Sequence, residues 1–432
     1  MSEEKFVDVA IVGGGPAGIA AAVAARRAGS SVVVIDEYAA PGGQIWRRRF
    51  DEAGESAPPS LPADARAHVA ELAASGADLL AGRSVWGTPE PGVLMLTGPG
   101  PARLCAKAIV LCTGAYDRPV AFPGWTLPGV LTAGAAQALA KCQGVLPGRR
   151  VLLAGAGPFL LPVARRLASQ GAAVVAVAEA TRRRDWLRFA PQMARHAARL
   201  AAYAGYRTRV RNVSWGRVIV RAEGDGRVES ATLAACGRDW APIPGTERTF
   251  AVDAVCTAYG FLPNTELARA LGCEPAGEAV AHDGAMETSV PGVYVAGEVA
   301  GIGGAELATV EGEIAGRAAA GAATGPSARE KPADFARILG DLFDPHPGLA
   351  TLATPDTVLC RCEDVTAGEV DAAVAAGART PAELKIVTRC GQGPCQGRVC
   401  ERLVAARLPA GGRYSSRAPI APVPLAVLMR DR

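Results

Sequence analysis

The sequence predicts an α/β protein with two Rossmann-like nucleotide-binding domains, followed by a small α-rich C-terminal domain built around cysteines. Two units of buried strand, glycine-rich turn, helix and second strand begin near residues 6 and 151. Five of the 11 cysteines crowd into residues 360–400. At 432 residues, the chain is long enough for several domains.

Composition excludes several classes of protein. Hydrophobic residues make up 49% of the chain, which indicates a globular protein. A net charge of +4, without interleaved basic and aromatic residues, argues against a nucleic-acid partner. Residues 1–8 lack the features of a signal peptide, and the apolar runs are too interrupted for a transmembrane segment. We therefore expect a cytoplasmic protein, with peripheral contact to a membrane left open.

The first unit carries a complete dinucleotide fingerprint. Gly13 permits a tight turn, Gly15 lets the backbone approach a pyrophosphate, and Gly18 lets the helix pack closely on the strand. The pyrophosphate would lie at the helix N-terminus, where free N–H groups favour anions. Asp36 ends the second strand and can accept hydrogen bonds from a ribose.

The second unit has an altered fingerprint. Leu160 stands where the third glycine belongs, so we expect the helix to be displaced or a dinucleotide to be obstructed. Glu179 follows the second strand and could still hold a ribose. NAD(P) binding is therefore doubtful; binding of another nucleotide and a purely structural role remain open.

Later segments resemble the flavoprotein superfamily with two dinucleotide domains, which includes thioredoxin reductase and glutathione reductase. The resemblance covers residues 6 to about 320 and rests on three motifs: Pro41-Gly42-Gly43-Gln44, Cys112-Thr113-Gly114, and Thr288 to Glu298, where glutamate replaces the usual aspartate. It implies FAD at the first site. The candidate FAD contacts are Gly13, Gly15, Pro16, Ala17, Gly18, Asp36, Glu37, Gly43, Gln44, Val85, Thr113, Gly114, Gly297 and Glu298.

The cysteine cluster predicts a metal site. Cys360 and Cys362 form a Cys-x-Cys pair, and Cys395 and Cys400 form a Cys-x4-Cys pair after a gap of 32 residues. Zinc favours Cys-x-x-Cys pairs, whereas iron–sulfur clusters accept varied spacings. A [2Fe-2S] cluster is favoured, with zinc and no metal as alternatives. Glycines at 391, 393 and 397 would let backbone N–H groups approach the sulfurs.

The pattern from Thr388 to Cys400 resembles the ferredoxin-like module related to bacterioferritin-associated ferredoxin. This resemblance implies that Cys360, Cys362, Cys395 and Cys400 bind the cluster and that Cys390 does not.

Nearly the whole chain, including the proline-rich tail from Pro419 to Leu425, resembles one family. Its members are the α (B-type) subunits of hydrogen cyanide synthase, opine oxidases, and dye-linked proline and D-hydroxyproline dehydrogenases. The resemblance implies an electron-transfer subunit of a hetero-oligomer, with a D-amino-acid-oxidase-like FAD subunit as partner. It also admits FMN at a subunit interface and a small [2Fe-2S] subunit. A self-sufficient NAD(P)H-dependent reductase and a redox-sensing binding protein are the alternatives.

These interpretations give a division into domains. Residues 1–118 and 250–322 would form a split FAD-binding domain around an inserted NAD-type domain, residues 119–249. A linker, 323–354, would lead to the [2Fe-2S] domain, 355–405, and a tail, 406–432. No catalytic acid–base constellation is apparent, since the four histidines fall in helical or loop contexts.

Overall fold

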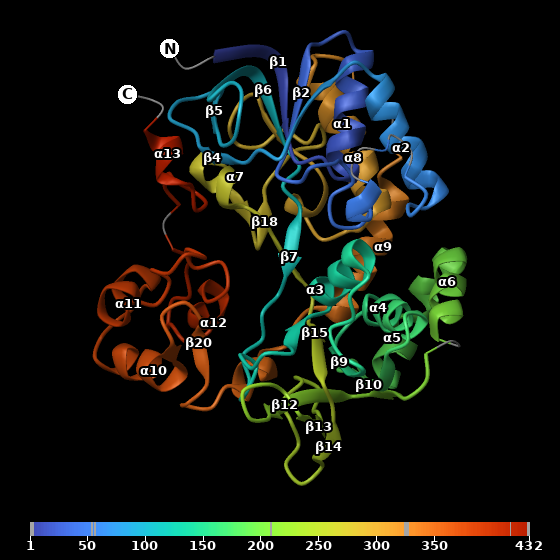
Figure 1. Ribbon diagram of the computed structural model, residues 1–432, viewed down its shortest axis with the longest axis vertical. Coiled ribbons are helices and arrows are strands. Elements are labelled where there is room, and N and C mark those ends of the chain that lie inside the picture. The colour runs from blue at the N-terminus through green and yellow to red at the C-terminus, as the bar shows by residue number, and fades with distance from the viewer. Residues whose placement is uncertain are drawn as a thin grey trace. The chain divides into compact units, whose positions relative to one another are not determined.

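The computed structural model describes residues 4–52, 55, 58–207, 210–323, 328–414 and 416–429. The chain forms two compact units (Figure 1). Unit 1 comprises residues 1–116, 262–337 and 416–432, and unit 2 comprises residues 117–261 and 338–415.

Unit 1 is built on a seven-stranded sheet in the order β3-β2-β1-β6-β5-β4, with β19 also paired to β6. Strands β1, β2, β3, β6 and β19 run parallel, whereas β4 and β5 add antiparallel pairs. Strand β19 comes from a segment far along the chain, so the sheet is assembled from two separate stretches of sequence. The strands are β1 (Glu4–Val12), β2 (Val32–Asp36), β3 (Asp78–Ala81), β4 (Val85–Gly87), β5 (Val93–Leu96), β6 (Arg103–Leu111) and β19 (Val293–Val295).

Two helices of unit 1 pack backbone against backbone. A side chain added at Gly312 would lie 2.1 Å from the carbonyl oxygen of Ala17, and one at Gly316 would lie 2.2 Å from that of Ala21. Small residues at the crossing therefore bring α8 against α1, in agreement with their neighbouring ribbons in Figure 1. The helices of unit 1 are α1 (Pro16–Arg27), α2 (Ala63–Ala74), α7 (Glu266–Ala270), α8 (Ala305–Ala319) and α13 (Leu425–Leu428).

Unit 2 contains a parallel five-stranded sheet in the order β11-β10-β9-β15-β8 and an antiparallel three-stranded sheet, β12-β13-β14. The strands are β8 (Val130–Thr132), β9 (Arg150–Gly155), β10 (Ala173–Glu179), β11 (Val213–Trp215), β12 (Arg217–Glu223), β13 (Ser230–Ala235), β14 (Arg248–Ala251) and β15 (Ala254–Ala258). The helices are α3 (Ala133–Ala138), α4 (Leu160–Ser169), α5 (Arg183–Met193) and α6 (Ala197–Arg207). Short strands complete the two units: β7 (Ala115–Asp117), β16 (Phe261–Pro263), β17 (Pro275–Ala276) and β18 (Ala279–Val280).

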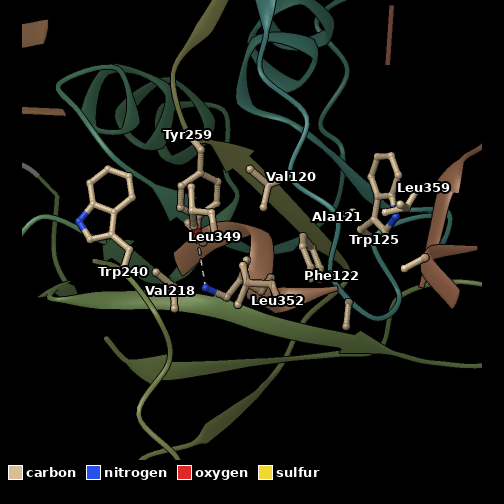
Figure 2. Packing of buried hydrophobic residues seen from close by; sticks show 14 of the residues in the cluster. Val120, Ala121, Phe122, Trp125, Val218, Trp240, Tyr259, Leu349, Leu352 and Leu359 are labelled. Carbon is tan, nitrogen blue, oxygen red and sulfur yellow. Dashed lines mark hydrogen bonds between the residues drawn. The ribbon is translucent and has the colours of Figure 1, made fainter. Parts of the chain in front are cut away.

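One predicted boundary is wrong. The sequence assigns β15 to the FAD-binding segment that begins at residue 250, but the strand lies between β9 and β8 in the second sheet. The side chain of Tyr259, just beyond β15, is fully buried in the same unit, and its hydroxyl accepts a hydrogen bond from the N–H of Ile219 at 3.2 Å (Figure 2). The chain returns to unit 1 at Leu262, because the apolar residues before it complete the core of unit 2.

The described part of the predicted linker, 323–354, is largely helical. Helix α9 spans Glu330–Phe343, and a 3-10 helix spans Pro347–Leu352. Leu349 and Leu352 lie in the buried cluster of unit 2, beside residues of β12 and the chain around Phe122 (Figure 2). Pro332 lies in the first turn of α9, where proline is tolerated, so it does not interrupt the helix.

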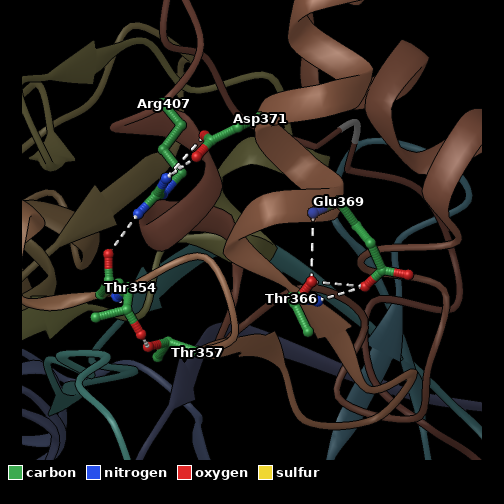
Figure 3. A network of polar contacts seen from close by, with 7 residues as sticks. Thr354, Thr357, Thr366, Glu369, Asp371 and Arg407 are labelled. Carbon is green, nitrogen blue, oxygen red and sulfur yellow. Dashed lines mark hydrogen bonds and ion pairs between the residues drawn. The ribbon is translucent and has the colours of Figure 1, made fainter.

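The cysteine-bearing part of unit 2 is mainly helical, as predicted. It contains β20 (Val358–Cys360), β21 (Val365–Thr366), α10 (Ala367–Ala375), α11 (Pro381–Thr388) and α12 (Glu401–Ala405). The capping box expected at Thr366 and Glu369 is present, with the Thr366 N–H donating to the Glu369 carboxylate at 2.8 Å (Figure 3). Arg407 forms an ion pair with Asp371 at 2.6 Å and thereby ties the chain after α12 to α10 (Figure 3).

The predicted tail, 406–432, is divided: residues 406–415 belong to unit 2, and residues 416–432 belong to unit 1. The Ser416 hydroxyl donates to the carbonyl of Glu266 at 3.0 Å, and the Ile420 N–H donates to the carbonyl of Trp86 at 2.8 Å. Among the described residues, no helix has the length and apolar character needed to cross a bilayer.

Candidate cofactor sites

The first fingerprint loop joins β1 to α1 with no room for side chains at two of its glycines. Gly13 has φ +108°, and a side chain there would lie 2.1 Å from the carbonyl oxygen of Cys112. A side chain at Gly18 would lie 1.8 Å from the carbonyl oxygen of Gly13. These contacts hold the N-terminus of α1, which begins at Pro16 with Gly15 as its N-cap, against the end of β1.

The middle glycine of the fingerprint, Gly15, faces open space. A side chain built there would meet a single neighbour within 4 Å, the Cα of Gly43 at 3.8 Å. The Gly42 N–H donates to the Gly14 carbonyl at 2.7 Å, so the turn containing Gly42 and Gly43 is fixed across the loop. The result is a cradle of bare backbone at a helix N-terminus, which fits the pyrophosphate of a dinucleotide.

Asp36 serves the loop itself. Its Oδ2 accepts the Gly14 N–H at 2.6 Å, and its Oδ1 accepts the Tyr38 N–H at 2.8 Å. The side chain is 5% exposed, and burial raises the pKa of its carboxyl. The neighbouring Glu37 is exposed at the same strand end. We propose that Asp36 positions the glycine-rich loop and that Glu37 is the acid available to the ribose.

Other predicted FAD contacts lie around this cradle with their polar groups already bonded. Thr113 Oγ1 donates to the carbonyl of Asn264 at 2.6 Å. Glu298 Oε1 accepts the Gly304 N–H at 2.7 Å, and burial raises its pKa. The backbones of Gly114 and Gly297 both adopt positive φ.

Three further contacts complete the predicted set. A side chain at Gly297 would lie 3.0 Å from the Cβ of Ala17, which places this segment beside the start of α1. Gln44 donates to the Tyr38 hydroxyl at 2.8 Å. Val85 is buried in β4, among apolar side chains of the sheet.

Sequence reasoning missed a buried ion pair in this unit. Glu311, 2% exposed, accepts the Gly297 N–H at 3.0 Å and pairs with Arg329 at 2.8 Å. The acidic Glu311 on the otherwise apolar face of α8 could have indicated this pair in the sequence, because a buried acid requires a partner.

The second fingerprint has an aromatic ring beside its middle glycine. A Cβ at Gly157 would lie 3.6 Å from Cγ of Phe343, an ordinary contact distance, so the ring at the end of α9 lies next to the backbone that a pyrophosphate would approach. Phe343 also packs edge-on against Trp186 at 5.5 Å. Helix α4 begins only at Leu160, whose side chain is buried. These features argue against the binding of NAD(P) at this fingerprint.

Glu179 is also turned inward. Its carboxylate accepts the N–H groups of Gly157 at 3.1 Å and Thr181 at 3.0 Å, and burial raises its pKa to about 8. It therefore takes the loop-holding position that Asp36 takes in unit 1.

The four cysteines predicted to bind a cluster form two pairs. Cys360 and Cys400 have their sulfurs within 4.8 Å of each other. Cys395 is a neighbour of Cys362, and the backbone of Gly393, two residues before Cys395, lies directly against the Cys362 side chain. Each of these contacts joins one cysteine of the Cys-x-Cys pair to one cysteine of the Cys-x4-Cys pair. The arrangement suits a cluster of two irons, each with two thiolates. We propose these four as the ligands.

Cys390, which the family resemblance places outside the ligand positions, lies beside one of these pairs. Its sulfur is within 4.8 Å of those of Cys360 and Cys400, and all three side chains are buried. Hydrogen bonding to Cys360 raises the pKa of the Cys390 thiol to about 12. The spacing along the chain gave no signal for this proximity, because Cys390 arrives through the tertiary fold.

The glycines of this loop serve the packing of two side chains. Side chains at Gly391 and Gly397 would lie 2.5 Å and 2.4 Å from the ring of Tyr414, and one at Gly393 would lie 2.1 Å from the Cβ of Cys362. Bare backbone in this loop therefore packs directly against Cys362 and Tyr414.

Comparison with known families identifies both parts of the chain. Residues 7–319 match the family described as pyridine nucleotide-disulphide oxidoreductase, and residues 358–408 match the BFD-like [2Fe-2S] binding domain. The first match indicates FAD and the second a [2Fe-2S] cluster, in agreement with the cradle and the cysteines described above.

Among curated proteins, the opine oxidase A subunit of Rhizobium meliloti is 35% identical, over 91% of this chain and 90% of that protein. Hydrogen cyanide synthase subunit HcnB of Pseudomonas aeruginosa is 32% identical, over 96% of each. Among solved structures, L-proline dehydrogenase from P. horikoshii has a TM-score of 0.68 at 22% identity, covering 99% of this chain and 81% of that one. Thioredoxin reductase from T. acidophilum has a TM-score of 0.56 at 21% identity, covering 73% and 98% respectively. These two structures confirm the predicted fold class.

A first prediction concerns Gly15. Gly15→Val should abolish flavin retention, because branched carbons would fill the space beside Gly43 that the pyrophosphate needs. Flavin content after gel filtration, read from the absorption spectrum, measures the effect. Gly284→Val is the matched control, since its new Cβ would meet nothing within 4 Å. Stoichiometric flavin in Gly15→Val would place the cofactor elsewhere.

A second prediction separates the two acids at the end of β2. Glu37→Ala should weaken FAD binding about tenfold to a hundredfold, the effect of losing hydrogen bonds to a charged group, while leaving the melting temperature of the flavin-free protein unchanged. Asp36→Asn should lower that melting temperature, because an amide nitrogen would oppose the backbone N–H groups. Fluorescence titration with FAD and thermal unfolding distinguish them. Unaltered affinity in Glu37→Ala would reassign the ribose contact.

A third prediction tests the proposed ligands. Alanine at Cys360, Cys362, Cys395 or Cys400 should remove the iron and the electron paramagnetic resonance (EPR) signal of the reduced cluster, because each iron needs two thiolates. Cys105→Ala, at a partly exposed cysteine of unit 1, is the control and should retain both. Full iron content in any of the four variants would exclude that residue.

Proposed function

The chain belongs to the pyridine nucleotide-disulphide oxidoreductase family and, over nearly its full length, to the group of opine oxidase and hydrogen cyanide synthase subunits; from this membership we propose that it is the electron-transfer subunit of a heteromeric amine dehydrogenase. It is a flavin-dependent oxidoreductase. In the proposed complex, a D-amino-acid-oxidase-like subunit with its own FAD removes two electrons and a proton from the C–N bond of an amino acid, opine or secondary amine.

The presence of two kinds of redox site in one chain supports this role. A flavin exchanges two electrons, whereas a [2Fe-2S] cluster exchanges one at a time, so together they connect amine oxidation to a one-electron acceptor. The residues of this chain bind and orient these groups: the bare backbone at Gly15 and Gly43 for FAD, and the two cysteine pairs for the cluster.

The altered second fingerprint is the observation that carries the proposal. Leu160 replaces its third glycine, and Phe343 lies beside Gly157, so unit 2 is a poorer candidate than unit 1 for binding a dinucleotide. The cysteines offer no other route, because all eleven lie in the described residues and none forms a disulfide. Both observations support the proposal that electrons reach the flavin of this chain from another protein.

The histidines give no sign of acid–base chemistry in the chain itself. His68 stacks on Trp46 at 5.2 Å, and His346 packs edge-on against Trp240 at 4.8 Å. His196 is buried, and His282 bonds the carbonyl of Asp283 at 2.8 Å. Structural contacts thus account for all four side chains. Oxidation of the amine is accordingly assigned to the partner, and FMN at the interface or a small [2Fe-2S] subunit would extend the same electron path.

Partner dependence is the fourth prediction. The isolated chain should show negligible amine:dye activity, and co-expression with a D-amino-acid-oxidase-like subunit should restore it. Anaerobic stopped-flow mixing of the lone chain with amino acids, opines and NADH follows flavin bleaching directly. The complex should bury about 1,600 Å² or more, as stable interfaces do.

Each alternative function has its own outcome in this assay. Rapid bleaching by an amine without a partner would contradict the subunit model. Rapid bleaching by NADH would establish a self-sufficient reductase. Absence of turnover with every donor, with or without the partner, would favour a redox-sensing protein.

A further inference from the structure

Two acids bond the turn after β19 to helix α8. The Oε1 of Glu298 accepts the Gly304 N–H at the start of α8 at 2.7 Å, and Glu311, further along the helix, accepts the Gly297 N–H at 3.0 Å. The turn from Gly297 to Gly304 is therefore held at both of its ends. It carries two of the predicted FAD contacts, Gly297 and Glu298.

The backbone of Gly297 lies directly against the helix that begins at the pyrophosphate cradle. Its φ is +76°, and a side chain there would lie 3.0 Å from the Cβ of Ala17 in the first turn of α1 and 3.3 Å from the Cβ of Ala308 in α8. A movement of this peptide would therefore disturb the start of α1, where the pyrophosphate is expected.

Glu311 is a buried charge with an arginine as its partner. Its side chain is 2% exposed and lies among small and apolar residues of α8. Its Oε2 accepts the Gly297 N–H, whereas its Oε1 accepts the Nε–H of Arg329 at 2.9 Å and lies 2.8 Å from Nη2. Two nitrogens of the guanidinium thus approach one oxygen, and the other oxygen holds the backbone. A carboxylate buried to this extent requires such a countercharge.

We propose that Arg329 is a positioning residue for FAD: it supplies the countercharge of Glu311, Glu311 fixes the N–H of Gly297, and retention of the flavin depends on this series of contacts. Arg329 lies outside both fingerprints, 18 residues after Glu311, and its side chain is 34% exposed. A residue near the surface therefore acts on the cofactor through a buried one. The inference goes beyond the proposed function, because it concerns how unit 1 holds its flavin and not the source of the electrons.

Loss of the arginine would affect the buried member of the series first. The Glu311 carboxylate would lose its countercharge in an apolar surrounding, and it would have to bind a proton or rotate toward water. Either change weakens its bond to the Gly297 N–H, because a charged acceptor forms a stronger hydrogen bond than a neutral one. The bare backbone at Gly15 and Gly43 would remain, so FAD would still bind but would dissociate faster.

Flavin release from the full-length chain tests the proposal. Each variant is loaded with FAD and diluted, and the rise in flavin fluorescence gives the release rate. Arg329→Gln should release FAD about tenfold faster than the native chain, or more, the effect of weakening a hydrogen bond to a charged group. A native release rate in this variant would overturn the proposal.

Arg26→Gln is the matched control for a general loss of stability. Arg26 lies on α1 about 15 Å beyond Pro16, and its guanidinium donates to the carbonyls of Ser30 at 2.8 Å and Ser75 at 3.2 Å. This variant should lower the melting temperature of the flavin-free protein and keep the native release rate. If it released FAD as fast as Arg329→Gln, the effect would be one of general stability, and Arg329 would have no positioning role.

A double variant tests whether Arg329 acts through Glu311. In Glu311→Gln/Arg329→Gln, the neutral amide needs no countercharge, and its oxygen can still accept the Gly297 N–H. The release rate should return to within about threefold of the native value, since residues that act through one another are not additive. Release as fast as in Arg329→Gln alone, or faster, would contradict the proposed series of contacts. Failure of the proposed function is distinct, because it would appear in the amine assay with the partner and leave these ratios unchanged.

Discussion

Backbone contact at glycine is the constraint on which unit 1 depends. Helix α1 touches the end of β1 where Gly18 meets the carbonyl of Gly13, and it touches α8 where Gly312 and Gly316 meet the carbonyls of Ala17 and Ala21. A methyl group at any of these positions would overlap a backbone atom. The first contact sets the helix N-terminus for a phosphate, and the others join the late segment of the chain to the early one. The same close packing therefore creates the cofactor cradle and unites the split domain.

The two fingerprints show how small sequence changes alter one motif. In both, an acid at the end of the second strand turns back to bind the N–H groups of its own loop. In unit 1, the neighbour of Gly15 is the bare backbone of Gly43, whereas in unit 2 the neighbour of Gly157 is the ring of Phe343. The acid thus preserves the shape of the loop in each case, and access depends on what lies above the second glycine.

The sequence was sufficient for the features that local chemistry determines. Both strand–turn–helix units and the capping box at Thr366 follow from glycine spacing, apolar runs and cap residues. The sequence was insufficient to predict contacts between segments that are far apart along the chain. Phe343 and Cys390 are ordinary in their local sequence, and their importance comes from the residues they contact after folding. Helix α9 was missed because Pro332 and the preceding polar residues suggested a linker, although Ile338 and Leu342 have the spacing of a buried helix face.

The placement of residues 416–432 in unit 1 has a consequence for how the chain can be divided. The polypeptide passes between the units four times, after residues 116, 261, 337 and 415, so neither unit is a continuous stretch. Removing the last residues would take Ile420 from the edge strand that contains Trp86 and leave the cysteine loop whole. Truncation of the C-terminus would therefore destabilise unit 1, which binds the flavin. The cysteine-bearing part of unit 2 would remain intact, although the removed residues follow it in the sequence. Separate expression of either half would require rejoining the chain in a new order.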